Sequence, residues 1–119
     1  MKKVCFSRKY EHPAAIMTWK LDINLADGIV VGSATHAYES VKFEFPNLSG
    51  QILETGQGGF ELAIHAGGVG SALPYVDKAL ISGFLQIDND FQRALSCAKI
   101  ATVGSTTDIA FELYYPCPN

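Results

Sequence analysis

The sequence has no long apolar run, and this absence limits the classes of protein to which it can belong. An apolar stretch of about 18 residues, the length of a membrane-spanning helix, occurs nowhere in the chain. The N-terminus has two lysines but lacks the apolar segment that a secretory signal needs. We therefore expect a cytoplasmic protein with no membrane partner.

An excess of basic charge is also missing. The net charge is −3, whereas nucleic-acid binders use clustered Lys and Arg to displace counterions from phosphates. We expect no nucleic-acid partner. The basic residues Lys2, Lys3, Arg8 and Lys9 do gather around the apolar segment 4–6, a pattern that favours a solvated edge strand over a local contact with an anion.

Paired cysteine motifs are absent as well. Cys5, Cys97 and Cys117 form no CxxC pair and have no histidine at metal-ligand spacing, so neither a metal site nor another cofactor is expected. The odd number of cysteines favours free thiols. A bridge between Cys5 and Cys117 is the alternative, because the first and last strands of a closed barrel are neighbours.

No segment has the sustained period of a capped helix, and strict alternation is present in its place. From Met17 to Leu25 the odd positions are apolar and the positions between them are polar, as in a strand with one buried face. Asp27-Gly28, a dipeptide typical of two-residue hairpin turns, then precedes the apolar run 29–31. Without a crossover helix the sheet should be antiparallel.

The register of this hairpin follows from its turn. If Asp27-Gly28 forms the whole turn, Trp19 faces His36 and Met17 faces Tyr38. The apolar residues of both strands then lie on the same face of the hairpin. The sequence therefore predicts that Trp19, His36 and Tyr38 point into one shared interior.

Further alternating segments predict a closed sheet. Short strands are expected on both sides of Pro46, which should interrupt pairing, and the flexible run Gly67–Pro74 is expected to be the longest loop. Later strands are expected at 78–87, 93–103 and 109–115. The whole chain, 1–119, should form one all-β domain, a small antiparallel β-barrel of about eight or nine short strands. A β-sandwich is the alternative.

The sequence contains no recognisable catalytic motif. The glycine runs at 56–59 and 67–70 do not open a helix that could hold a phosphate, and no serine lies in a GxSxG elbow. His36 is the residue of most interest, because a buried imidazole needs a partner for at least one nitrogen. It could be a neutral core histidine, or it could face a ligand in a cavity.

The segment Ile87-Asp88-Asn89-Asp90-Phe91, followed by the small residues Ala94, Ser96 and Ala98, resembles small bacterial all-β domains of unknown function. A middle region punctuated by glycines extends the resemblance, which covers mainly residues 15–54 and 78–115. Such domains bring no assigned activity. The resemblance therefore implies a fold and no function.

Two functional hypotheses remain. The first is a binding or interaction module, more consistent with the sequence than an enzyme, whose interior is either filled or holds one small apolar ligand. Its expected ligand-binding residues are Trp19, His36, Tyr38, Phe43, Phe60 and Phe111. The second is a cofactor-free barrel enzyme of the isomerase or cyclase type that uses His36 or Tyr38 as acid or base. A homodimer formed by pairing of edge strands is an open possibility for the oligomeric state.

Overall fold

The structure is a computed structural model that describes residues 1–11, 14–72 and 75–117, and within these ranges every regular element is a β-strand. The strands are β1 (Lys2–Glu11), β2 (Ala14–Asn24), β3 (Ile29–Tyr38), β4 (Val41–Thr55), β5 (Gly59–Ala72), β6 (Tyr75–Asp88), β7 (Arg93–Thr102), β8 (Ser105–Ile109) and β9 (Glu112–Tyr114). The all-β class is confirmed. In the part of the chain that the structure describes, no helix has the length and apolar character to cross a membrane.

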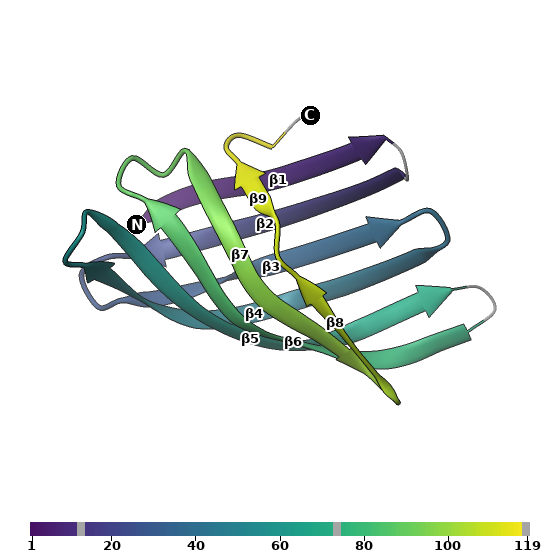
Figure 1. The fold of residues 1–119 in the computed structure, drawn as a ribbon. Coiled ribbons are helices and arrows are strands. Elements are labelled where there is room, and N and C mark those ends of the chain that lie inside the picture. Colours follow the sequence, from purple (N-terminus) through teal and green to yellow (C-terminus); the bar gives the residue numbers. More distant parts are fainter. Residues whose placement is uncertain (12–13, 73–74, 118–119) are drawn as a thin grey trace.

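Eight of the strands close into an antiparallel barrel. Strands β1 to β7 each pair with the next strand along the chain, and β9 completes the ring between β7 and β1. Figure 1 shows β1 to β6 as one strongly curved sheet whose concave side is crossed by β7, β8 and β9. Consecutive antiparallel pairs produce this topology, since antiparallel neighbours need no long connection. The predicted small antiparallel barrel is confirmed.

The seam of the barrel lies between β1 and β9. These two strands share one register pair, Ser7 opposite Tyr114. β8 lies outside the ring and pairs with β7 alone among the described strands. The seam therefore opens beyond Ser7, toward the C-terminal end of β1.

A disulfide between Cys5 and Cys117 ties the C-terminal segment to β1, with 5.4 Å between the two Cα atoms. The sequence favoured free thiols, so this part of the prediction is wrong and its alternative holds. Closure of the barrel brings the first strand and the end of the chain together, as the alternative required. Cys97 is the exception, with a free and exposed thiol.

Alternate side chains fill the interior, as the period of two predicts. Phe6, Trp19 and Phe45 are at most 2% exposed and belong to one continuous apolar core. Trp19 and His36 both lie on the inward face of their hairpin, at 2% and 4% exposure. The shared interior expected for these two residues is therefore present.

The register of the β2–β3 hairpin differs from the prediction by two residues. The turn contains four residues, 25–28, so Trp19 faces Ala34 and His36 faces Met17. The Asn24 side chain accepts a hydrogen bond from the Ala26 amide at 3.0 Å, and the Asp27 side chain accepts one from the Ile29 amide at 2.9 Å. These local hydrogen bonds stabilise the longer turn.

The longer turn changes the position of Leu25. This residue belongs to the turn and is 52% exposed, whereas the alternation predicted that it would be the last inward residue of the strand. Gly28 ends the turn with a φ of +76°, a conformation that glycine adopts without steric cost. Because the register shifts by an even number of residues, all inward residues of the hairpin except Leu25 stay on their predicted face.

Two expected interruptions are instead continuous strand. Pro46 lies within β4, where the register against β3 and β5 shifts by one residue and forms a bulge. A bulge accommodates proline because it already leaves a residue unpaired. The expected loop from Gly67 is the end of β5, which continues to Ala72, while the rest of that loop, including Pro74, lies outside the described residues.

Candidate functional site

The filled core ends at a definite level inside the barrel. Phe6 faces Trp19, Trp19 faces Ala34 and Ala34 faces Phe45 across four neighbouring strands. All four side chains are at most 3% exposed. This row forms a dry floor, and the interior below it is occupied by packed apolar side chains.

The next inward row toward the open end is partly accessible. It runs from Arg8 on β1 through Met17, His36 and Phe43 to Gly70 on β5. Arg8 and Phe43 are half-buried, whereas Met17 and His36 are almost fully covered. The boundary between core and solvent therefore passes through this row.

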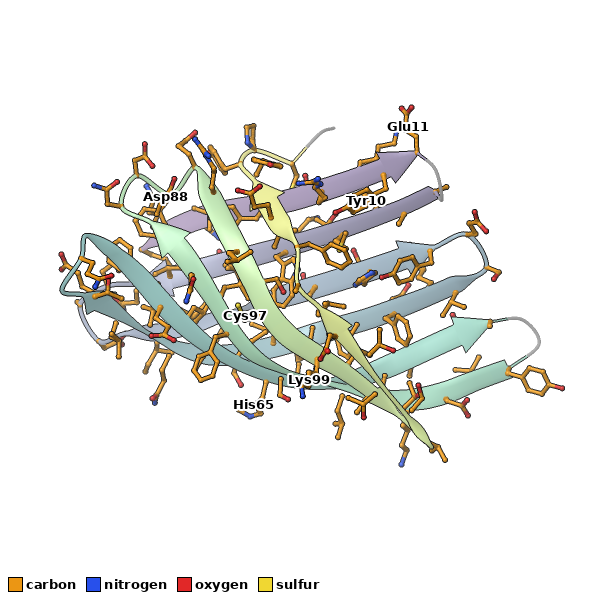
Figure 2. All side chains as sticks on the ribbon, viewed as in Figure 1. Tyr10, Glu11, His65, Asp88, Cys97 and Lys99 are labelled. Atoms are coloured by element: carbon orange, nitrogen blue, oxygen red, sulfur yellow. A yellow bond between two sulfur atoms is a disulfide. The ribbon has the colours of Figure 1, made fainter. Side chains whose placement is uncertain are left out.

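Aromatic rings gather above the floor at this end of the barrel. The centroid of the His36 ring lies 4.4 Å from that of Tyr38, 5.9 Å from that of Phe111 and 6.4 Å from that of Phe43. The Tyr10 ring lies 5.6 Å from Phe111, and Figure 2 shows Tyr10 on β1 near the open end. We call these five residues the aromatic mouth. The four rings around His36 are half-buried, so each keeps part of its surface available for contact.

His36 has a buried nitrogen with no partner. Its Nε2 atom is the one buried side-chain nitrogen or oxygen in the described part of the chain that makes no hydrogen bond to another group of the protein. By contrast, the buried Ser96 hydroxyl donates a hydrogen bond to the Ile109 carbonyl. A buried polar atom without a partner is costly, so a hydrogen bond to Nε2 would remove an unfavourable contribution to the free energy of folding.

Burial also controls the protonation of the two polar rings. Removal from water lowers the pKa of His36 to about 4, because burial disfavours the charged imidazolium. The pKa of Tyr38 is raised above its usual value, mainly by burial and further by the neighbouring Tyr10 phenol. At neutral pH the mouth therefore holds an uncharged His36 imidazole and an uncharged Tyr38 phenol.

Glycines on β5 make room for two of the aromatic rings. A Cβ atom at Gly70 would lie 2.7 Å from the ring of Phe43, so this ring rests against the bare backbone of β5. A Cβ atom at Gly68 would meet both the Phe45 ring and the backbone oxygen of Glu44. The glycine-rich run is therefore part of the wall of the mouth.

The structure divides the six predicted ligand-binding residues into three groups. His36, Tyr38, Phe43 and Phe111 are brought together in the aromatic mouth. Trp19 belongs to the floor beneath them. Phe60 lies at the other end of the barrel, where it faces Glu54 beside the β4–β5 turn and packs against Phe91 with 4.7 Å between ring centroids.

Tyr10 was not among the predicted residues. Its signal in the sequence is the continuation of the even-numbered inward set of β1 from Val4 and Phe6. That alternation places Tyr10 on the inner face. Its neighbour Phe111 is far away in sequence, and the contact between them arises from closure of the barrel.

A hollow lies on the outside of the barrel. It has a volume of about 780 Å³ and is lined mainly by outward residues of β1 to β3 and by the segment 115–117. Its charged side chains Lys3 and Asp22 form an ion pair with each other at 3.4 Å. Because Lys3 and Asp22 neutralise each other and the hollow lies against the outer side of the sheet, it is a weaker candidate than the mouth.

The described residues contain no cluster of three or more His, Cys, Asp or Glu side chains that could hold a metal ion. Comparisons of the chain with protein families, curated proteins and solved structures found no match. Fold and site thus define a small, closed antiparallel β-barrel with an aromatic mouth at one end.

Proposed function

We propose that this chain is a non-enzymatic binding module that holds one small apolar ligand in the aromatic mouth. The observation that carries the proposal is the buried, unpartnered Nε2 atom of His36, a residue that is 4% exposed among half-buried aromatic side chains. Sites for small molecules combine apolar walls with a few polar groups that fix orientation. Here the rings supply the walls and Nε2 supplies the polar contact.

The pKa shifts favour binding over acid–base catalysis. A catalytic acid or base works best with a pKa near the operating pH. The pKa of His36 is lowered to about 4 and that of Tyr38 is raised, so both shifts lead away from neutrality. The isomerase or cyclase hypothesis, with His36 or Tyr38 as acid or base, is therefore the second candidate.

A fluorescent apolar probe tests the proposal. N-phenyl-1-naphthylamine is uncharged, has an amine that can reach His36, and becomes brighter in an apolar environment. We expect saturable binding by the intact chain. Replacement of Phe43 or Tyr38 by Ala should weaken binding by at least about tenfold, the effect of losing roughly 1.4 kcal/mol of ring contact.

The outer surface provides the matched control. Phe84 is 47% exposed and faces Cys97 on the outer side of the β6–β7 pair. Phe84→Ser should leave probe binding unchanged. If Phe84→Ser abolishes binding while Phe43→Ala and Tyr38→Ala do not, or if the intact chain binds no probe, the proposal is wrong.

A further inference from the structure

Arg8 lies at the edge of the aromatic mouth. It belongs to the same inward row as His36, with Met17 between them. Its guanidinium carbon lies 4.9 Å from the centroid of the Tyr10 ring and 5.5 Å from that of the Tyr114 ring. Arg8 therefore spans the open seam between β1 and β9, with one side toward the rings of the mouth.

The guanidinium of Arg8 has no carboxylate partner. No ion pair within 4 Å joins it to an acidic side chain among the described residues. Its Nη1 nitrogen donates to the Tyr114 hydroxyl at 3.2 Å and to the Glu112 carbonyl at 3.4 Å, while the Glu112 carboxylate accepts a hydrogen bond from Tyr114 at 3.1 Å. A guanidinium has five N–H donors, so most of its capacity for an anion is free.

The other basic residues near the N-terminus do not share this position. Lys2 lies over the ring of Phe91 at 4.8 Å, at the far end of the barrel. Lys3 forms an ion pair with Asp22. Lys9 is exposed and alternates onto the outer face. The four basic residues that are close together in the sequence thus lie in different places, and Arg8 alone among them borders the mouth.

We propose that the ligand of the aromatic mouth is an apolar or aromatic acid, whose anionic group binds Arg8 while its body lies against the rings and reaches His36. This inference rests on the proposed function. Arginine binds carboxylates and related anions through parallel N–H groups. The stacked Tyr10 ring holds the guanidinium in place, which reduces the entropy lost on binding.

The geometry also sets the size and direction of the ligand. Arg8 and His36 are separated by two strand spacings, roughly 10 Å between their backbones, a span suited to a body of about two fused rings. At the other end of the same row, Asp77 faces Gly70 and is exposed. Its negative charge opposes an anion at that wall, so the acidic group should point toward β1.

Two probes with the same ring skeleton separate this inference from the proposed function. N-phenyl-1-naphthylamine is uncharged, and 8-anilino-1-naphthalenesulfonate adds one sulfonate to it. In the variant Arg8→Met the charge is lost while an unbranched apolar stem, equal in length to the Arg side chain as far as Nε, is kept. We expect this variant to weaken sulfonate binding by about tenfold or more, as for a lost charged hydrogen bond, and to leave binding of the uncharged probe within about twofold.

Lys9→Met is the matched control, since it removes the same charge one residue away on the outer face. It should leave the affinities of both probes unchanged. Arg8→Lys should restore part of the sulfonate affinity, because it restores the charge without the planar fork. Thermal unfolding of each variant checks that the barrel is intact.

The outcomes are distinguishable. If neither probe binds the intact chain, the proposed function fails and this inference fails with it. If the uncharged probe binds but Arg8→Met and Lys9→Met weaken the sulfonate equally, only general attraction is at work and the inference about Arg8 is wrong. It is also wrong if Arg8→Met weakens both probes to the same extent, which would assign Arg8 a purely structural role.

Discussion

At the scale of single residues, His36 is the most informative position. It is buried in an apolar ring of aromatics, and its Nε2 atom has no partner within the chain. Such an atom lowers the stability of the folded state unless a hydrogen bond compensates for the lost contact with water. The position of His36 at the border of core and solvent links the packing of the barrel to the function proposed above.

The lowered pKa of His36 predicts a pH-dependent stability. The folded form has a pKa of about 4 and the unfolded form about 6.5, so the unfolded state binds more protons between these values. Stability is therefore fully present above pH 6.5 and decreases as the pH falls toward 4, by about 3 kcal/mol in total. Urea unfolding at pH 7.5 and pH 4 measures the change.

Variants separate the contribution of His36 to the pH dependence of stability from the contribution of the carboxylates. His36→Phe should lose about 3 kcal/mol less than the intact chain over this pH range, while His65→Gln, at an exposed position, should behave like the intact chain. Equal losses in the intact chain and in His36→Phe would contradict a neutral buried imidazole.

The glycines of β5 give a second prediction at this scale. Gly70→Ala should displace the Phe43 ring, at a cost of about 1–2 kcal/mol for overpacking, and weaken binding of the uncharged probe. Gly68→Ala should be worse, because the backbone oxygen of Glu44 cannot move away as a side chain can. Gly56→Ala, with open space around it, is the control. Similar stabilities of all three variants by urea unfolding would show that these contacts are unimportant.

At the scale of elements, the turn at 25–28 determines how β2 and β3 pair. Both Gly28 and Gly104 have a φ of +76°, but a Cβ at Gly28 would lie 2.9 Å from the Ile52 carbonyl oxygen, whereas Gly104 has nothing nearby. Gly104→Ala should cost about 1–2 kcal/mol from backbone conformation alone. Gly28→Ala should cost clearly more in thermal or urea unfolding, and equal costs would mean that the contact with Ile52 adds nothing.

The strands themselves were largely predictable from the sequence. Alternation identified β2, β3 and β7 close to their true bounds. The prediction of strand ends failed at Pro46, because a bulge can accommodate a residue without an N–H group. It failed again at Gly67–Ala72, because the glycines there allow aromatic rings to approach the backbone and do not form a turn. A sequence does not distinguish these two uses of glycine, because they differ in neighbours that are remote along the chain.

At the scale of the whole molecule, closure of the barrel depends on a weak seam. β1 and β9 share one register pair, and the Cys5–Cys117 disulfide lies beside it. The two cysteines are 112 residues apart, so the bridge constrains nearly the whole unfolded chain. Loop-closure entropy gives such a bridge on the order of 4–5 kcal/mol of stabilisation.

Removal of the bridge tests this role of the seam. In a Cys97→Ser background, which should itself change stability by less than about 0.5 kcal/mol, Cys5→Ser with Cys117→Ser should lower the free energy of unfolding by several kcal/mol. Urea unfolding of both proteins provides the measurement. A loss below about 1 kcal/mol would show that strand pairing alone is enough to close the barrel.

The amino-acid sequence by itself determined the all-β class, the antiparallel hairpins and the inward faces of the central strands, because these depend on alternation and turn chemistry between near neighbours. Only the tertiary structure decided which aromatics meet. Tyr10 joins Phe111 and Arg8 borders the mouth through closure between the two ends of the chain, while Phe60 is carried to the opposite end. Those placements follow from the register shifts, the bulges and the seam. Contacts between residues far apart in the sequence determine each of these features.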